Sequence, residues 1–402
     1  MNSSVKVLGR GLLKVNEFYY KGVIPSSKSV MNRLLICQSY SKDLRIDGDS
    51  QCDDVVLMKK ALSEFDTFNM YCGSAGTVLR FLAFKASRHA GNFLLRGTDR
   101  LLSRPIDDLL FILRQLGVSA SVGERGLEIA SGGWLNKESR IEVPRGKSSQ
   151  FLSGLLLNSW DLDRDIEFFW SGDVVSDGYL QITIDTLRSL GMALDVRKES
   201  IHVKRRQTIA VSQAEAESDL SSAFAVATMA VLGGEAHFLK FPFLSLQPDL
   251  EFVKILQAMN ASLDKTKDSL SVFKTDHLRP IDWNINDCPD LFPVLAILCS
   301  AADGTSVLHG APHLAYKESD RIGKTAELLN KMKIENEIIE GGMKIIGNRA
   351  VAQNFEFDTD EDHRLAFAAG AARLLGHRIR ILHPEVVTKS FPEFWEIAEP
   401  RK

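Results

Sequence analysis

Cysteine, net charge and long apolar runs are all scarce in this sequence of 402 residues. The five cysteines form no CxxC pair and have no cluster of histidines nearby, which argues against a disulfide framework and against a zinc site. Lys plus Arg (49) and Asp plus Glu (52) give a formal net charge of -3, so no overall basic field attracts nucleic acid or a membrane surface. No segment approaches the roughly 20 apolar residues of a membrane span, and the N-terminus lacks the long apolar stretch of a signal peptide. We therefore expect a cytoplasmic protein with no nucleic-acid or membrane partner.

Internal repetition is what the sequence does contain, in a chain long enough for about two domains. An amphipathic helix, a short break and a strand-turn-strand recur four times, as in LLSRPIDDLLFILRQLGVSASVGERGLEI. A second pattern, in which a helix with a small or polar start leads into a strand, occurs six times, at SSKSVMNRLLI, GSAGTVLRFLA, KSSQFLSGLLL, SDLSSAFAVAT, CPDLFPVLAIL and DEDHRLAFAAG. Together the patterns predict an α/β chain of six βαβαββ-like units. The first unit has a shortened hairpin near residues 53–65, and the last ends after a helix near residues 391–397 without a hairpin.

The six units predict two domains of three units each. Residues 4–18, which read as a pair of strands without a unit of their own, are expected to close the sixth unit. The chain then crosses between the domains near Tyr19 and near Glu217. This gives a central domain of residues 19–216 and a discontinuous domain of residues 1–18 and 217–402.

The six helix starts carry groups that suit an anion-binding cleft. Simple helix capping explains any one of them, but Lys28 and Arg33 lie in the first turns of a helix, where cations oppose the helix dipole unless they face a shared anion. In KESDR, Lys317 and Arg321 lie one turn apart, where like charges repel by about a few tenths of a kcal/mol; a solvated face with internal partners is the alternative. If the six N-termini face one interdomain space, that space strongly attracts phosphate and carboxylate.

These segments also carry a resemblance that spans nearly the whole chain. IPSSKSVMNR, GSAGTVLR, RP, SSQ, VSDGY, DLSSA, CPD, YKESDR, EDHR and TKSFPEF occur in the order found in the enolpyruvyl transferases, and resemble most the 5-enolpyruvylshikimate-3-phosphate synthase branch. The resemblance implies two domains, each of three βαβαββ units in an inverse α/β barrel, with the active site in the interdomain cleft. This agrees with the count of six units.

The resemblance also implies a reaction. The family transfers the enolpyruvyl group of phosphoenolpyruvate to the 5-hydroxyl of shikimate 3-phosphate by addition and elimination through a tetrahedral intermediate, and releases phosphate. This serves chorismate and aromatic amino acid biosynthesis in the shikimate pathway, where glyphosate competes with phosphoenolpyruvate. Neither a metal nor another cofactor is implied, and we expect a monomer.

The resemblance assigns site residues one by one. Asp290 would be the base at the 5-hydroxyl, Glu318 would exchange the methylene proton, and Lys28 would assist proton transfer. The residues expected to bind phosphoenolpyruvate are Lys28, Gly76, Arg104, Gln150, Arg321, Arg364 and Lys389. The residues expected to bind shikimate 3-phosphate are Lys28, Ser29, Arg33, Ser148, Ser149, Gln150, Ser176, Tyr179, Asp290 and Lys317.

Some positions depart from the family pattern, and two other functions remain open. Ser74, Phe81, Gly178, His313 and Ala315 stand where the family usually has asparagine, proline, proline, asparagine and arginine. One alternative is a UDP-N-acetylglucosamine enolpyruvyl transferase, which shares the fold and donor but fits KESDR and SSQ less well. The other is a non-catalytic anion-binding pseudoenzyme. Asp290 and Glu318 argue against it, because carboxylates weaken anion binding unless proton transfer needs them.

Overall fold

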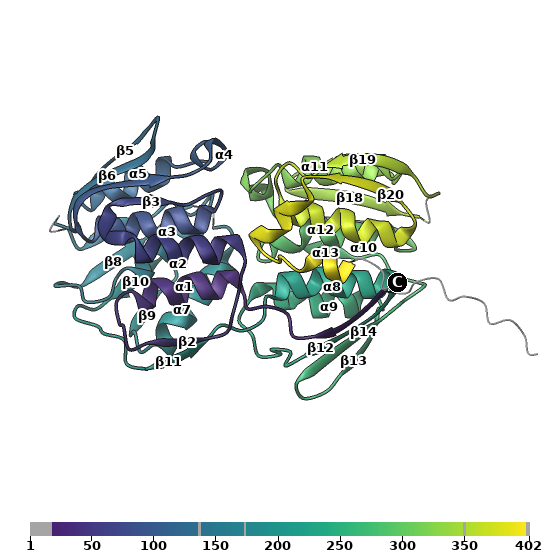
Figure 1. Cartoon of the computed structure of the whole chain (residues 1–402), viewed down its shortest axis with the longest axis horizontal. Coiled ribbons are helices and arrows are strands. Elements are labelled where there is room, and N and C mark those ends of the chain that lie inside the picture. The colour runs from purple at the N-terminus through teal and green to yellow at the C-terminus, as the bar shows by residue number, and fades with distance from the viewer. Residues whose placement is uncertain (1–17, 136–137, 173, 349–350, 399–402) are drawn as a thin grey trace, which may run out of the picture.

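The computed structural model describes residues 18–135, 138–172, 174–348 and 351–398, which form two lobes (Figure 1). Each lobe has its own hydrophobic core. One core contains buried side chains between Val30 and Ala216, whereas the other combines Phe18 and Ile24 with buried side chains from Leu220 onward. The predicted division at residues 19 and 217 stays a prediction. By these cores, the chain passes from one lobe to the other between Ile24 and Val30, and again between Ala216 and Leu220.

Three sheets belong to the first lobe, and they are ordered β3-β4-β6-β5, β7-β8-β10-β9 and β11-β2. The first pair of strands in each sheet is parallel, and the last two strands of the four-stranded sheets form antiparallel hairpins. The strands are β2 (Arg45–Asp47), β3 (Asn69–Tyr71), β4 (Ala90–Arg96), β5 (Ser119–Gly123), β6 (Gly126–Gly132), β7 (Arg140–Glu142), β8 (Ile166–Phe169), β9 (Leu194–Val196), β10 (Ser200–Val203) and β11 (Gln213–Glu215).

The second lobe repeats this arrangement with sheets ordered β1-β12-β14-β13, β15-β16-β18-β17 and β19-β20. Its strands are β1 (Phe18–Gly22), β12 (Gly234–Leu239), β13 (Ser262–Lys265), β14 (Ser269–Phe273), β15 (Asp282–Asn284), β16 (Gly304–His309), β17 (Asn336–Ile339), β18 (Gly342–Gly347), β19 (Asn354–Asp358) and β20 (Arg378–Leu382).

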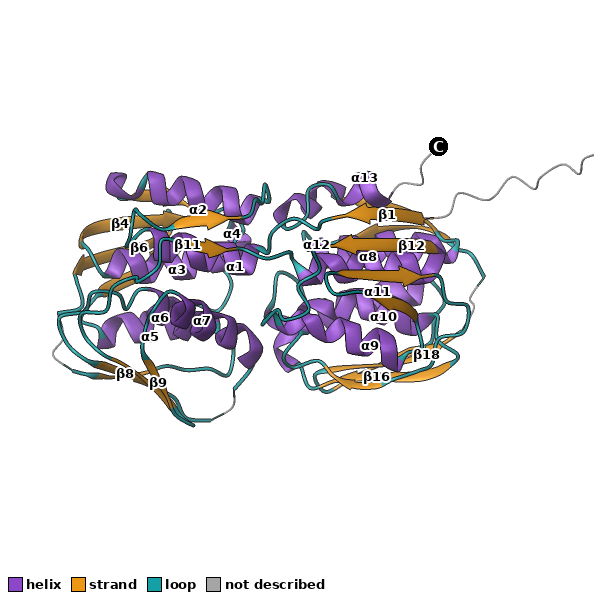
Figure 2. Ribbon diagram, turned by 90° about the horizontal axis from the view of Figure 1, so that it is seen from below, coloured by secondary structure: helices purple, strands orange, loops and turns teal. Residues whose placement is uncertain are grey.

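The central helices of each lobe lie inside and the four-stranded sheets lie outside them, whereas α2 and α13 lie at the outer edge of their lobes, as Figure 2 shows. In the first lobe α1, α3 and α6 contact one another, and in the second lobe α8, α10 and α12 do so. Every residue of α10 and α12 is buried, and apart from Ser300, His363 and Arg364 these helices consist of apolar residues. The inner helices are α1 (Lys28–Gln38), α3 (Gly76–Ser87), α6 (Gln150–Leu157), α8 (Leu220–Gly233), α10 (Phe292–Ser300) and α12 (His363–Ala372).

The remaining helices are amphipathic or short, and those long enough to have two faces bury only one of them. The α-helices of this group are α2 (Asp53–Ser63), α4 (Asp99–Leu102), α5 (Asp107–Gln115), α7 (Asp177–Ser189), α9 (Phe252–Ala258), α11 (Arg321–Lys331) and α13 (Phe394–Ala398). The 3-10 turns are η1 (Phe65–Thr67), η2 (Pro248–Glu251), η3 (Pro289–Leu291), η4 (Pro312–Tyr316), η5 (Arg373–Leu375) and η6 (Pro384–Lys389).

The βαβαββ units appear as the repeats predicted. Three of them are continuous in sequence, and they run from β3 to β6, from β7 to β10 and from β15 to β18. Within the described residues, the first unit has no hairpin between α2 and β3, and no hairpin follows β20. The predicted strand pair at residues 4–18 lies outside the described residues except for Phe18, and Phe18 pairs with Gly234 at the start of β12.

The two passages between the lobes run side by side. β1 pairs with β12 of the second lobe just before the chain enters the first, and β11 pairs with β2 just before the chain returns. Between these strands Ser26 bridges Ser218, and the Ser27 amide donates to the Glu217 carbonyl at 2.7 Å. The helices α1 and α8 that follow therefore start from one shared point at the seam.

Candidate active site at the seam between the lobes

The inner helices of both lobes begin at the seam, where the starts of α1, α3, α6 and α12 and the turn before α10 line a polar cavity. Of the described residues, none at the start of α8 lines it. Most of the predicted site residues line this cavity, and they come from both lobes. The predicted residues in the lining are Lys28, Ser29, Arg33, Gly76, Arg104, Ser148, Ser149, Gln150, Ser176, Tyr179, Asp290, Lys317, Glu318 and Arg321. The two others, Arg364 and Lys389, lie just behind it and form ion pairs with Asp290 and Glu318.

The helix N-termini at the seam differ in their capping. In the second lobe, Asp219 and Asp362 cap α8 and α12 by accepting hydrogen bonds from the Ser222 and Arg364 amides at 2.8 and 2.9 Å. In the first lobe, α1 and α3 begin without a side-chain cap from any described residue. Their first N–H groups are therefore available to an anion in the cavity.

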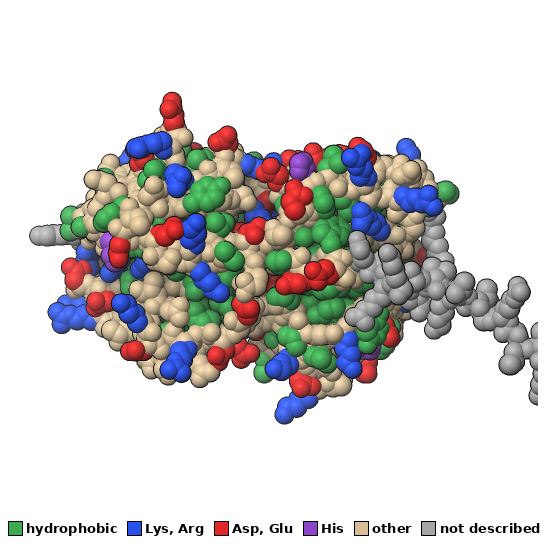
Figure 3. All heavy atoms as spheres, in the orientation of Figure 1, with side chains coloured by type: hydrophobic (Ala, Val, Ile, Leu, Met, Phe, Trp, Pro, Cys, Tyr) green, Lys and Arg blue, Asp and Glu red, His purple; other side chains and the backbone are tan. Residues whose placement is uncertain are grey.

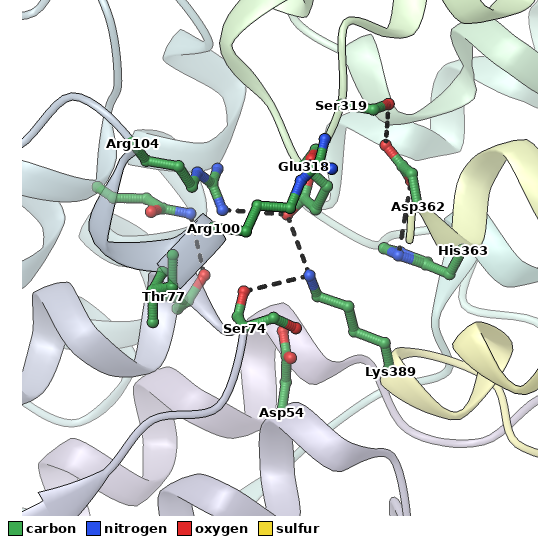
Figure 4. Close-up of polar contacts among 12 residues, drawn as sticks. Asp54, Ser74, Thr77, Arg100, Arg104, Glu318, Ser319, Asp362, His363 and Lys389 are labelled. Atoms are coloured by element: carbon green, nitrogen blue, oxygen red, sulfur yellow. Dashed lines mark hydrogen bonds and ion pairs between the residues drawn. The ribbon is translucent and has the colours of Figure 1, made fainter. Parts of the chain in front are cut away.

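Glu318 is the centre of one group of charges (Figure 4). Its carboxylate lies 2.8 Å from Arg321 Nη2, 3.5 Å from Arg104 Nη1 and 3.9 Å from Lys389 Nζ. Burial alone raises the pKa of Glu318, but Arg104, Arg321 and Lys389 outweigh it and hold that pKa well below its ordinary value. Glu318 is therefore ionised. It forms ion pairs with Arg104, Arg321 and Lys389, the same cations that are expected to bind phosphoenolpyruvate.

Asp290 is the centre of a second group. Its two carboxylate oxygens accept hydrogen bonds from Arg321 Nη1 at 2.8 Å and from Arg364 Nη2 at 3.0 Å. Burial raises the pKa of Asp290, but Arg364, Arg321 and then Lys317 lower it far more. Arg364 is 2% exposed, and its Nε and Nη1 donate to no described residue, so its capacity to bind an anion is not used up.

Two lysines in the cavity differ in their surroundings. Lys28 Nζ lies 3.5 Å from the Asp54 carboxylate. Burial lowers the pKa of Lys28, but Asp54 together with Glu318 raises it by more, so this pKa lies above its ordinary value. Among the described residues, Lys317 forms no ion pair, and burial lowers its pKa to about 8 although Asp290 opposes this. His363 Nε2 lies 3.4 Å from Lys28 Nζ, and burial together with Lys28 keeps the pKa of His363 well below its ordinary value, so the imidazole is neutral.

On the other side of the cavity, Arg33 has a structural role that its position in the sequence does not reveal. Its guanidinium donates to the Thr183 hydroxyl at 2.7 Å and to the Ser29 and Tyr179 carbonyls at 2.7 and 2.8 Å. It also lies over the ring of Phe81, 5.5 Å from the centroid. Arg33 thus ties α1 to α7 and holds two other predicted site residues in place.

Two predicted site residues at the start of α7, Ser176 at its N-cap and Tyr179 in its first turn, contact the second lobe. The Ser176 hydroxyl lies 3.0 Å from His313 Nε2, and the Tyr179 hydroxyl donates to the Asp249 carboxylate at 3.0 Å. Ser176 has a left-handed backbone with φ of 54°, which directs the chain into the first turn of α7.

Comparison with known proteins decides the family. The family model for EPSP synthase (3-phosphoshikimate 1-carboxyvinyltransferase) matches residues 25–397. The chain belongs to the EPSP synthase family. Relatives named 3-phosphoshikimate 1-carboxyvinyltransferase occur in Syntrophobacter fumaroxidans, at 29% identity over 94% of this chain and 96% of the relative, and in Methanoculleus marisnigri, at 32% over 81% and 77%.

A solved structure supports the fold. The EPSP synthase of Acinetobacter baumannii superposes with a TM-score of 0.74 at 22% identity, covering 95% of each chain. The predicted two-domain α/β fold is thereby confirmed. Of the helices described, none has both the length and the apolar character that a membrane crossing requires. The described ranges likewise contain no group of three His, Cys, Asp or Glu side chains arranged to hold a metal ion.

In this EPSP synthase family member, residues outside the predicted set also reach the cavity. The lining also includes Asp54, Thr77, Arg80, Lys147, Tyr316 and His363. Arg80 and His363 belong to helix starts that the sequence had singled out, and Arg80 donates to Gln150 Oε1. Arg80 follows Gly76 by one turn on α3, and this spacing indicates that Arg80 also faces the site. No sequence pattern indicates Asp54, because only the packing of α2 beside α1 brings it to Lys28.

Proposed function

We propose that this protein transfers the enolpyruvyl group of phosphoenolpyruvate to the 5-hydroxyl of shikimate 3-phosphate and releases inorganic phosphate. The observation that carries the proposal is the pair of partly buried carboxylates, Asp290 and Glu318, among arginines and lysines in one cavity of an EPSP synthase family chain. A site that merely held anions would be weakened by these carboxylates, whereas proton transfer requires such groups.

The donor, phosphoenolpyruvate, and the acceptor, shikimate 3-phosphate, bind in different parts of the site. The donor's phosphate and carboxylate take the cations around Glu318 and Asp290, since planar guanidinium groups bind both anions through paired hydrogen bonds. The residues that bind the donor are Lys28, Gly76, Arg104, Gln150, Arg321, Arg364 and Lys389. The residues that bind the acceptor are Lys28, Ser29, Ser148, Ser149, Gln150, Ser176, Tyr179, Asp290 and Lys317, with Arg33 at the edge of the cavity.

The chemistry needs one proton to move at each substrate. With the donor bound, Glu318 carries a proton taken up from solvent. In the addition, the 5-hydroxyl oxygen bonds to C2 of the donor and loses its proton to Asp290, while C3 gains the proton of Glu318. In the elimination, the bond from C2 to the phosphate oxygen breaks, C3 returns a proton to Glu318, and the leaving phosphate takes the proton held by Asp290 and departs as inorganic phosphate. Lys28 stabilises the negative charge that develops and assists proton transfer.

The ion pairs explain how two ionised carboxylates become proton carriers. Arg321 and Arg364 hold Asp290, and Arg104, Arg321 and Lys389 hold Glu318. When the anions of the donor recruit these same cations, both carboxylates lose stabilising partners, and their pKa values rise. The donor thereby prepares the site for the proton transfers that follow.

An assay of phosphate release tests the function against its alternatives. The purified protein is mixed with phosphoenolpyruvate and shikimate 3-phosphate, with each substrate alone, and with phosphoenolpyruvate and UDP-N-acetylglucosamine. Release only with the first pair supports the proposal. Release with the nucleotide sugar would instead assign the chain to the other acceptor, and tight binding without release would make it a pseudoenzyme.

A further inference from the structure

One arginine outside the predicted site makes a contact between the lobes that bears directly on Glu318. Arg100 lies in α4 of the first lobe, a single helical turn that Thr98 caps at its N-terminus. Its Nε donates to the Glu318 carbonyl at 2.6 Å, and its Nη1 and Nη2 donate to the two carboxylate oxygens of Asp360 at 2.8 Å each. Figure 4 shows Arg100 beside Glu318.

The backbone of Glu318 needs such a support. Glu318 lies between η4, which ends at Tyr316, and α11, which starts at Arg321, so no helix fixes its main chain. Its side chain is held by cations that the donor is proposed to recruit. The Arg100 contact is made to the carbonyl oxygen, so the donor can exchange the side-chain partners of Glu318 without disturbing it.

Asp360 connects the same arginine to a second loop of the site. Asp360 and Glu361 have left-handed backbones, with φ of 50° and 54°, and lead into Asp362 at the start of α12. Asp362 in turn accepts a hydrogen bond from Arg321 Nε at 2.8 Å. A bidentate arginine–carboxylate pair fixes orientation as well as distance. Arg100 thus joins two loops of the second lobe from a single point on the first.

We infer that Arg100 is a positioning residue for Glu318, which makes the placement of the proton-transferring carboxylate depend on contact between the lobes. The inference rests on the proposed function. Arg100 itself touches no reacting atom in this assignment; it acts through the Glu318 main chain and the Asp360 loop. A displacement of about 1 Å at a proton donor lowers turnover by up to about a hundredfold, so loss of this support is measurable.

The test combines kinetics with exchange at the donor. Arg100→Ala should lower kcat about tenfold or more and reduce exchange of the donor's methylene protons with solvent by a similar factor, while the KM for shikimate 3-phosphate changes little. Arg100→Lys keeps the positive charge but not the two parallel N–H groups of the guanidinium that bind Asp360. Its kcat should lie between those of the wild type and Arg100→Ala. Arg96→Ala is the matched control, because Arg96 is exposed and hydrogen bonds Asn69 within its own lobe; kcat should stay unchanged.

A double mutant shows whether Arg100 positions Glu318 or only holds the two lobes together. In a Glu318→Gln background, Arg100→Ala should cost little further kcat, because the group that Arg100 positions is already disabled. The full loss in that background, or raised KM values for both substrates with an unchanged kcat, would overturn the inference.

A readout independent of activity separates this inference from the proposed function. Backbone amides of residues 317–320 should exchange with deuterium faster in Arg100→Ala than in the wild type or Arg96→Ala. Equal exchange in all three proteins would overturn the positioning role, even if the wild type releases phosphate as proposed. If Arg100→Ala exchanges faster but the wild type releases no phosphate, Arg100 still positions the Glu318 backbone and the proposed enolpyruvyl transfer is refuted.

Discussion

At the scale of single residues, the site balances its own charge. Arg104, Arg321, Arg364 and Lys389 face Asp290 and Glu318, and Lys28 faces Asp54. Buried ions of one sign are costly without partners, so the two carboxylates proposed for proton transfer also keep the cations ionised and in place. Loss of either carboxylate therefore changes both electrostatics and chemistry.

Replacing Glu318 with glutamine tests its role as proton carrier. The amide keeps the shape and the hydrogen-bond acceptor but cannot carry the proton, so turnover should fall by about 10²–10⁴-fold while shikimate 3-phosphate binding is retained. Rapid-quench turnover and acceptor titration measure the two effects. Glu327→Gln, on the exposed side of α11 where Glu327 pairs with Lys324 and Lys331, is the control and should remain active. Undiminished turnover in Glu318→Gln would remove Glu318 from the mechanism.

Asp249 gives the protein a pH-dependent stability. It is 3% exposed and accepts from the Tyr179 hydroxyl; burial, and then the nearby Asp290, raise its pKa to about 7, although Arg364 opposes this. A carboxyl with a raised pKa in the folded state binds its proton more tightly there than in the unfolded chain. Its contribution is therefore fully present below about pH 4 and is lost as the pH rises to about 7, by at most about 1.4 kcal/mol per pH unit.

Urea unfolding between pH 4 and 8 measures this contribution. Asp249→Asn removes the titrating group but keeps an oxygen for Tyr179, so the stability difference between wild type and variant should change with pH over this range. Asp264→Asn, on an exposed position of β13, should show a constant difference. A constant difference for Asp249→Asn as well would mean that this carboxyl does not titrate as described.

At the scale of elements, α7 and η2 approach each other closely across the seam because residue 178 is glycine. A Cβ added to Gly178 would lie 2.6 Å from Pro248 Cβ and 3.1 Å from Pro248 Cγ. The neighbouring contacts from Ser176 to His313 and from Tyr179 to Asp249 depend on this approach. The family usually has proline at position 178, and here glycine leaves room for Pro248 of the second lobe.

Gly178→Ala should keep the lobes slightly apart. We expect kcat/KM to fall about tenfold or more, since groups from both lobes must meet around the substrates, while stability changes little because alanine favours the first turn of α7. Steady-state kinetics and thermal unfolding measure the two. Gly123→Ala is the matched control, because its added Cβ meets only Glu128 side-chain atoms at 3.7 Å or more. Full activity in Gly178→Ala would show that the seam tolerates the extra carbon.

At the scale of the whole molecule, two cores are joined by two short passages and by polar contacts. The core side chains of the lobes form separate clusters, and the seam is held by pairs such as Arg100–Asp360. Charged side chains of both signs are interspersed over the face shown in Figure 3. A polar interface of this kind couples the lobes only weakly.

The lobes should therefore unfold in separable steps. Calorimetry of the free protein should give a van't Hoff enthalpy below the calorimetric one, and shikimate 3-phosphate with an unreactive donor analogue should raise and merge the transitions, because ligand bound between the lobes stabilises both. Tryptophan fluorescence assigns the steps. With Trp283 and Trp395 of the second lobe changed to phenylalanine, the remaining tryptophans, Trp134, Trp160 and Trp170, report the first lobe alone. Coincident transitions without ligand would contradict weak coupling.

The sequence by itself determined the repeating units and the chemistry at the helix starts. Local signals suffice for both: period and turns define the helices and hairpins of βαβαββ units, and residues such as Lys28, Gly76 and Arg321 lie where a helix begins. Because each inner helix in a unit runs in the same direction, the repeat also implies that its starts share one end of a lobe.

Only the tertiary structure decided which of these groups meet. Asp54 reaches Lys28 from a helix that carries no distinguishing motif, and Arg33 donates to α7 some 150 positions away. β1 and β11 pair with strands far along the chain, and local pattern does not show which strands these are. The contact of Arg100 with Glu318 likewise depends on the relative placement of two lobes with separate cores. Such pairings are set by packing and charge between distant segments, for which a single sequence carries no periodic signal.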